Sequence, residues 1–373
     1  MSDSLSRGQP VQASVDAGDF LSALKKVRAV LRKSSIPVLE EVFVRFCGGR
    51  CILTATDMET WIIAEIPADG DDFAFVFSRT IYVENACRYF GGKLTLTMED
   101  LGEDKHCRPV VTLSCGSRSG EFDAYPAGDY PDTPEVSGDV VFTANAAALL
   151  DRVRRVSYAA CRADRNRKRP DFCVQFVGSR IYALDGCRAA WDDGQEAVPQ
   201  PFLIDAEALR CLRAFGRSQV EFRFSQSRLF VTGRAITVIY RIVELPPFRL
   251  DSAIPRKYAE TFSASPQELL SGLQYLNAAA PKTRTPYVFL NGSELSMTVN
   301  GRKYSVVTDI QRNGDMVVRL NLHYMVDALK QFSKEKCVTI KISGIHTPVV
   351  IEAEGRSVHA MVLPIRSSVS AAA

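Results

Sequence analysis

The sequence contains no run of apolar residues long enough to span a bilayer, and its start, from Met1 to Pro10, lacks the apolar core of a signal peptide. We therefore expect the protein to stay in the cytoplasm. Its ten cysteines are scattered singly, and even Cys47 and Cys51 do not form a CxxC pair. This spacing favours buried, reduced thiols over a disulfide framework or a metal site.

Catalytic motifs are also missing. The chain has no nucleophile elbow, Walker loop or dinucleotide fingerprint. The four histidines, His106, His323, His346 and His359, are far apart and lack the HxxxH spacing of a zinc site. We therefore expect no enzyme activity, no cofactor and no bound metal. A metal-dependent nuclease or other DNA-modifying enzyme, whose carboxylates assemble only in three dimensions, stays open as an alternative.

One pattern occurs three times, at a spacing of roughly 120 to 130 residues. Each copy has an apolar helical stretch, then strands, a second helix and closing strands that end at a proline. The first helices are predicted to run onward from Phe20, Leu149 and Leu269, and the second helices to span 77–90, 204–215 and 320–332. Ser78, Asp205 and Asn321 stand where helix N-caps are expected. Asp57 and Asp185, at matching repeat positions, are predicted to be turn-forming carboxylates.

This repeat predicts an α+β protein of three repeated domains. A chain of 373 residues is too long for one core. Phe20, Leu24 and Val27 fall on one face of a helix, and residues 220–224 alternate as a half-buried strand does. Two helices packed on antiparallel sheet are therefore expected in each domain. The predicted ranges are 11–137, 138–257 and 258–366, with a disordered N-terminus at 1–10 and a tail at 367–373.

Positive charge gathers on the predicted helices although the net charge is only +3. About half of the 46 Lys and Arg residues lie in about a quarter of the chain. A shared sign on all helices predicts contact with duplex DNA through its phosphates, without base reading. For any single helix an ordinary solvated face is the alternative. The residues predicted to face DNA are Lys25, Arg28, Arg32, Lys33, Arg88, Arg152, Arg155, Arg162, Arg165, Arg167, Arg210, Arg213, Lys282, Arg284 and Lys334.

Helix dimensions then suggest an assembly. Six helices, each about 10 Å wide, would ring a bore of only about 9 Å, whereas twelve would ring a bore of roughly 28 Å. The wider bore passes a duplex about 20 Å across. A head-to-tail homodimer, each chain forming half of a ring, is therefore expected.

Several strings resemble the β sliding clamp family, the β subunit of bacterial DNA polymerase III. They are IPVL at 36–39, LTATD at 53–57, YPAGDYP at 125–131, LDGCR at 184–188 and LPIR at 363–366. Each is weak alone, but together they span nearly the whole chain in order. The resemblance implies a non-catalytic processivity factor that encircles DNA and tethers DNA polymerase, clamp-loader subunits and other replication or repair proteins.

The resemblance also implies a cleft that binds short linear motifs of those partners. Carried over by position, the cleft comprises Asp185, Gly186, Cys187, Arg188, Pro247, Tyr324, Pro348, Val362, Leu363, Pro364, Ile365 and Arg366. The chain departs from the family at Leu184 and Cys187, where Thr and His are usual, and continues past Arg366. These departures leave the motif preference open.

Ring closure would involve Arg118, Glu121 and Asp123 in the first domain and Arg302 and Lys303 in the third. Relatives tend to place basic residues on the edge strand of the first domain and acidic residues on the matching part of the third. We hypothesise that the polarity is partly reversed here, which would disfavour mixed rings. The alternative is that these charges are merely solvated. An accessory paralogue that binds partner peptides without encircling DNA also stays open.

Overall fold

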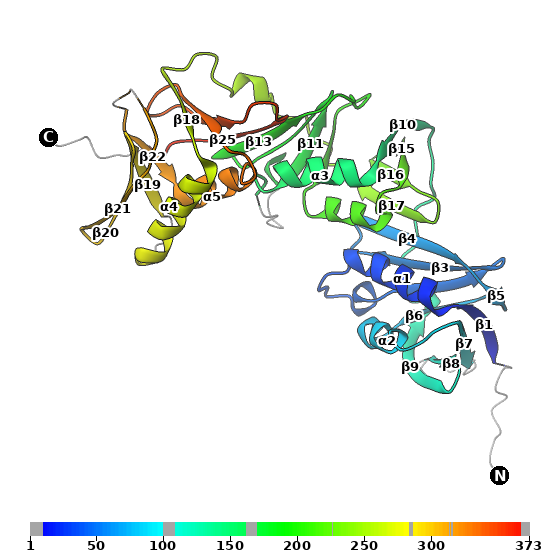
Figure 1. Ribbon diagram of the computed structural model, residues 1–373. Coiled ribbons are helices and arrows are strands. Elements are labelled where there is room, and N and C mark those ends of the chain that lie inside the picture. Colours follow the sequence, from blue (N-terminus) through cyan, green and yellow to red (C-terminus); the bar gives the residue numbers. More distant parts are fainter. Residues whose placement is uncertain are drawn as a thin grey trace, which may run out of the picture. The chain divides into compact units, whose positions relative to one another are not determined.

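The computed structural model describes residues 10–99, 109–161, 170–225, 227–282, 286–312, 314 and 316–366 (Figure 1). They fall into two compact units, one drawn from Met1–Leu150 and Glu207–Ile242 and the other from Asp151–Ala206 and Val243–Ala373. Each unit consists of antiparallel sheet with a few short helices, which confirms the predicted α+β class. The three domain ranges given above stay a prediction. None of the helices in these ranges has the length and apolar character needed to cross a membrane.

The first unit contains one sheet of thirteen strands. β4 (Thr60–Pro67) and β17 (Ile236–Arg241) belong to different copies of the repeat and pair antiparallel from Thr60↔Tyr240 to Ala64↔Ile236. This pairing joins the first and second copies of the repeat, and each copy is called a module from here on. The spatial order is β10 (Val140–Asn145), β15 (Gln219–Ser225), β16 (Arg228–Thr232), β17, β4, β3 (Arg50–Thr56), β2 (Phe43–Cys47), β6 (Phe73–Phe77), β9 (Arg118–Pro126), β8 (Val110–Cys115), β7 (Lys93–Glu99), β1 (Val11–Asp16) and β5 (Asp69–Gly70).

The second unit contains two sheets. In the larger, β13 (Arg188–Asp193) pairs antiparallel with β25 (Val358–Val362) and so joins the second module to the third. Its order is β14 (Phe202–Asp205), β11 (Cys173–Val177), β12 (Arg180–Leu184), β13, β25, β24 (Val349–Glu352), β23 (Val338–Ile342) and β18 (Glu260–Ala264). The smaller sheet has the order β21 (Arg302–Val307), β20 (Glu294–Val299), β19 (Tyr287–Asn291) and β22 (Val318–Asn321).

The α-helices begin where side-chain oxygens accept from first-turn N–H groups, and one of them begins with Pro266, which has no N–H group. Asp16 caps the first of them by accepting from the Gly18 and Asp19 N–H groups at 2.8 and 3.0 Å, and the predicted cap Asn321 is confirmed by bonds to His323 and Tyr324. The α-helices are α1 (Ala17–Val27), α2 (Thr80–Cys87), α3 (Ala146–Ser157), α4 (Pro266–Ala279) and α5 (Leu322–Lys330). The short 3₁₀ segments are η1 (Arg28–Val30), η2 (Pro37–Glu40), η3 (Ala127–Asp129), η4 (Pro170–Phe172), η5 (Ala208–Phe215) and η6 (Leu250–Ser252).

Two predicted N-caps are wrong. Helix α2 has no side-chain cap, because its first N–H, from Thr80, donates instead to the Glu41 carboxylate at 2.6 Å. The helix expected after Asp205 begins three residues later and is the 3₁₀ helix η5, again without a side-chain cap. Ser78 and Asp205 therefore precede these segments without capping them.

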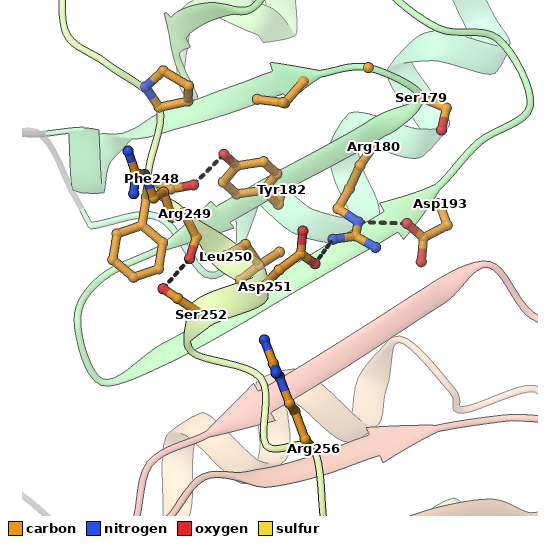
Figure 2. A pocket seen from close by; sticks show the side chains of 13 residues that line it. Ser179, Arg180, Tyr182, Asp193, Phe248, Arg249, Leu250, Asp251, Ser252 and Arg256 are labelled. Atoms are coloured by element: carbon orange, nitrogen blue, oxygen red, sulfur yellow. Dashed lines mark hydrogen bonds and ion pairs between the residues drawn. The ribbon is translucent and has the colours of Figure 1, made fainter.

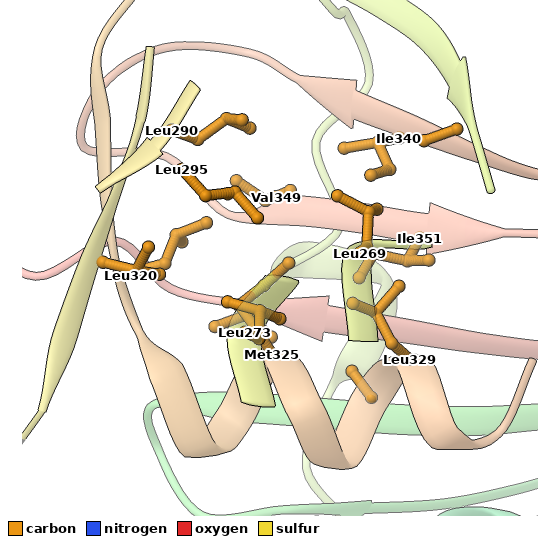
Figure 3. Close-up of a cluster of buried hydrophobic side chains, with 14 of the residues drawn as sticks. Leu269, Leu273, Leu290, Leu295, Leu320, Met325, Leu329, Ile340, Val349 and Ile351 are labelled. Atoms are coloured by element: carbon orange, nitrogen blue, oxygen red, sulfur yellow. The ribbon is translucent and has the colours of Figure 1, made fainter. Parts of the chain in front are cut away.

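The core of the third module shows how the helices are held. Leu269 and Leu273 of α4 and Met325 and Leu329 of α5 point toward strand residues including Leu290, Leu295 and Ile340 (Figure 3). Burying each such side chain contributes about 1.5–3 kcal/mol. The apolar stripes fix which faces of α4 and α5 are buried, so the polar residues of these helices stay at the surface.

Candidate nucleic-acid and peptide-binding surfaces

Seven of the cations predicted to face DNA are exposed, and two of these, Arg32 and Arg88, pair with acids. Lys25 and Arg213 lie in the last turns of α1 and η5, and Lys33, Lys282 and Lys334 follow η1, α4 and α5 within a few residues. Positive charge near a helix C-terminus is favourable by itself, because the helix dipole is negative there. The positions therefore suit phosphate contact, but they also suit ordinary helix stabilisation.

Three of the predicted cations hold acidic partners in the first unit. Arg28 and Arg88 share the carboxylate of Glu84, which is only 7% exposed. Arg32 lies 3.3 Å from Asp57 and 3.4 Å from Glu207. Their charge is largely balanced within the chain, which reduces what they can offer a phosphate.

Arg152 and Arg155 converge on Asp192, whose side chain is 1% exposed. The Arg152 Nε and Arg155 Nη1 atoms lie 2.9 and 3.0 Å from the two carboxylate oxygens. Arg152 also donates to the Ser179 carbonyl at 2.6 Å. This arrangement makes both arginines structural. Arg210 is half-buried, and the predictions for Arg162, Arg165, Arg167 and Arg284 lie outside the described residues.

Asp185 shapes the turn between β12 and β13. Its Oδ1 accepts from the N–H groups of Cys187 at 2.9 Å and Arg188 at 3.0 Å, while Gly186 takes a φ of 83°. Asp57 does the same in the first module, with the N–H groups of Glu59 and Thr60 at 3.2 and 2.8 Å. The prediction of turn-forming carboxylates at matched positions is confirmed.

Arg188 connects this turn to α5. Its guanidinium lies 3.0 Å from Asp185 and 2.8 Å from Asp327, and stacks over the ring of Tyr324 with 4.4 Å to the centroid. Burial lowers the pKa of Arg188, but the Asp327 hydrogen bond and the Asp185 charge outweigh it, so the net shift is upward. A planar cation is thus fixed beside Tyr324 with a side chain 12% exposed.

The C-terminal segment closes against the same turn. The Leu363 N–H donates to the Cys187 carbonyl at 2.8 Å, and the Ile365 N–H to the Arg319 carbonyl at 2.7 Å. Val362 and Pro364 are buried, whereas Arg366 is exposed. Pro348 precedes Val349, which lies opposite Val362. The structure therefore brings most of the predicted cleft residues together.

An apolar cluster lies beside this segment, and sequence reasoning missed several of its members. Leu184, Leu250 and Met361 are buried in it, and half-buried Leu363 packs against it. Met361 had a usable signal, since it lies two positions before Leu363 and would share its face in an extended chain. Leu250 and Asp327 had none, because only the fold brings them near the turn.

A hollow of about 710 Å³ adjoins the cluster, sharing Tyr182 and Leu250 with it (Figure 2). Pro247 belongs to its lining. The Tyr182 hydroxyl donates to the Phe248 carbonyl at 2.7 Å, and Arg180 is held between Asp193 and Asp251, each at 2.6 Å (Figure 2). These bonds fix the loop that carries Pro247.

His359, on β25, stacks on Trp191 of β13 with 5.0 Å between centroids. Burial lowers its pKa, partly opposed by Asp193 and Glu352. The unfolded chain therefore binds the proton more readily, so stability should fall as pH drops below about 6.5 and level off below the folded-state pKa. Urea unfolding at several pH values should show a shallower decline for His359→Gln than for the native chain, and equal slopes would contradict this.

The predicted ring-closing residues lie on two strand edges. Arg118, Glu121 and Asp123 are exposed on β9, and Arg302 and Lys303 are exposed on β21. β21 is the end strand of its sheet, and β9 pairs with β8 on one side while only its last residues, from Ala124, pair with β6 on the other. Two stretches of strand thus keep a side without a partner strand among the described residues.

No family model matches the chain. Its sequence is 21% identical over 368 residues to a curated protein of Chlamydia trachomatis named β sliding clamp, covering 94% of this chain and 86% of that protein. The crystal structure of the DNA polymerase III β subunit from Thermotoga maritima superposes with a TM-score of 0.81 at 18% identity, covering 96% of this chain and all of that one. The β chain from Streptococcus pneumoniae gives a TM-score of 0.82 at 17% identity, with 96% of this chain covered.

The chain has the β sliding clamp fold. The resemblance predicted from short strings is thereby confirmed over nearly the whole length, in sequence and in fold. Because the fold match extends across 96% of the chain, the β sliding clamp architecture includes all three copies of the repeat and both strand junctions between them.

Proposed function

We propose that this protein is a DNA sliding clamp: a non-catalytic processivity factor that encircles duplex DNA as a head-to-tail homodimer and tethers DNA polymerase. The observation that carries the proposal is the set of strand junctions. β4 of the first module pairs with β17 of the second, and β13 of the second pairs with β25 of the third. Each junction pairs a strand from the middle of one module with the last strand of the next. The same arrangement would pair β21, from the middle of the third module, with β9, the last strand of the first. Among the described residues of one chain both strands lack a partner there, so a second copy would supply it.

In this proposal DNA passes through the closed ring and is contacted without base reading. The exposed cations Lys25, Lys33, Arg213, Lys282 and Lys334 would approach phosphates, while the ion-paired arginines hold the helices in place. The protein would act in the cytoplasm, where bacterial chromosomes are copied.

Partner proteins would dock by short linear motifs in the cleft around Arg188, Tyr324 and Leu363. Its apolar floor and few fixed polar groups suit an extended peptide anchored by Leu and Phe side chains. Polymerase and clamp-loader subunits are the proposed owners of such motifs. A paralogue that binds these peptides without encircling DNA is the second candidate, since the cleft does not depend on ring closure.

Retention on DNA tests the proposal. Protein loaded on nicked circular plasmid should remain bound through gel filtration at high salt and be lost when the plasmid is linearised, because only a topological link survives screening. A monomer by light scattering, with intact peptide binding, would favour the paralogue. Magnesium-dependent cleavage of labelled duplex would favour the enzyme.

Removing the exposed cations tests the DNA-facing surface. Replacing Lys25, Lys33, Lys282 and Lys334 by Ala should lower the slope of log K against log salt by up to about 0.9 for each phosphate that is no longer neutralised. Fluorescence anisotropy of a labelled duplex measures the slope. A matched variant, with Arg234, Arg249, Arg256 and Lys257 replaced, removes four exposed charges from loops between strands and should leave the slope unchanged. Equal slopes for the two variants would contradict the assignment.

A further inference from the structure

We infer that the two free edges recognise each other by charge, with Glu121 and Asp123 of β9 facing Lys303 of β21, so that the contact selects a second copy of this chain. This inference rests on the proposed ring, and it adds which residues decide the match. In each of the two strands, the sides to which the backbone N–H and C=O groups point restrict how the strands can pair.

Backbone bonds show which residues of β9 face its free side. The Ala124 N–H donates to the Pro109 carbonyl at 2.8 Å, beside β8, while the Asp123 carbonyl accepts from the Ser78 N–H at 3.0 Å on the other side. Backbone groups of successive residues alternate between the two sides of a strand. Ser119 and Glu121 therefore direct their N–H and C=O groups to the free side.

The same reasoning applies to β21. The Thr308 N–H donates to the Ser293 carbonyl at 2.9 Å, on the β20 side. By alternation Lys303, Ser305 and Val307 direct their backbone groups outward. An antiparallel contact must therefore bond the odd-numbered residues of β9 to the odd-numbered residues of β21.

Residues opposite each other in a sheet, and residues two apart along a strand, share one face. Glu121 and Asp123 therefore lie on the same face as Lys303 in every register that these backbone directions allow. All three are exposed. The opposite face receives the half-buried Phe122 and Tyr304, which can bury apolar area, together with the exposed Arg118 and Arg302. Charge complementarity on the face of Glu121, Asp123 and Lys303 thus accompanies the backbone match.

The junctions inside the chain differ in chemistry. At the β4 and β17 junction the opposed pairs are Trp61↔Ile239 and Ile62↔Val238, and all four side chains are buried and apolar. Apolar strands pair well but discriminate little, whereas opposed charges reject a partner with the wrong sign. Lys303 also lies 2.8 Å from Glu294 of the neighbouring strand β20, so its ammonium would have to exchange or share this partner when it meets the acids of β9.

A charge exchange tests the inference. Glu121→Lys alone and Lys303→Glu alone should each raise the dimer dissociation constant at least about tenfold, and the double variant should restore it to within about threefold. When native chain and double variant are mixed, both contacts of a mixed ring bring like charges together, so native mass spectrometry should show homodimers only. Exchanging the exposed ion pair Arg50 and Glu65, 3.0 Å apart on β3 and β4, is the matched control and should allow free mixing.

The outcomes separate the inference from the ring itself. Dimers that mix freely with the double variant would overturn the charge match and leave the ring standing. A native chain that stays monomeric would overturn both. If the double variant fails to fold by circular dichroism, the neutral pair Glu121→Gln and Lys303→Gln serves instead: its dimerisation should depend less on salt than that of the native chain, and an equal dependence would overturn the charge match.

Discussion

Replacing Asp192 by Ala should lower the free energy of unfolding by about 3–5 kcal/mol. The side chain is 1% exposed and lies between Arg152 and Arg155, whose side chains are 19% and 35% exposed. Removing it leaves two partly buried guanidinium groups without a counter-charge. Urea unfolding followed by circular dichroism measures the loss.

Two controls separate this effect from general charge loss. Asp193→Ala removes a neighbouring carboxylate that is 39% exposed and pairs with Arg180, and should cost no more than about 1 kcal/mol. Arg154→Ala removes an arginine of the same helix that is 60% exposed and should be nearly neutral. Equal losses for Asp192→Ala and Asp193→Ala would contradict the buried-pair account.

Gly194→Ala perturbs the same cluster without changing charge. A Cβ at Gly194 would collide with the Arg152 guanidinium group, which would then have to leave Asp192. A loss of about 1–3 kcal/mol is expected. The cluster also explains why Arg152 is a poor probe of DNA binding, since its removal would weaken the fold and lower DNA affinity indirectly.

The repeat made much of the fold predictable, because local signals recur three times. The cap at Asn321 and the turns at Asp57 and Asp185 depend on residues two or three positions away, and all three are confirmed. The cap at Ser78 was wrong because a distant residue, Glu41, takes the N–H of Thr80. A carboxylate 39 positions away in the chain leaves no local signal.

The 3₁₀ helix η5 did have a signal. Its large apolar residues, Leu209, Leu212 and Phe215, recur every third position and are buried, while Arg210 and Arg213 occupy the intervening row. A period of three fits a 3₁₀ helix, in which residues three apart eclipse, better than the 3.6 of an α-helix. A strict count of the period would have favoured the observed geometry.

The basic surface was harder to predict, because sequence shows charge but not pairing. Arg28 and Glu84 are 56 residues apart, and Arg152 and Asp192 are 40 apart. Only folding reveals that such arginines are engaged with acids. The exposed Lys282 and Lys334, which follow α4 and α5, were easier to predict, because their exposure does not depend on pairing with a distant acid. The count of helix cations therefore exaggerates the charge available to DNA.

Replacing Leu363 by Asp should weaken binding of a partner peptide at least about hundredfold, because it places a charge in the apolar cluster where we propose that the peptide docks. The probe is a fluorescein-labelled synthetic peptide with Leu and Phe anchors, followed by anisotropy. Leu363 is half-buried and its backbone bond to Cys187 does not involve the side chain, so the strand should persist. Val136→Asp, at an exposed apolar residue outside the cluster, is the control and should bind normally. Retained affinity in Leu363→Asp, with dimerisation and melting temperature unchanged, would place the peptide elsewhere.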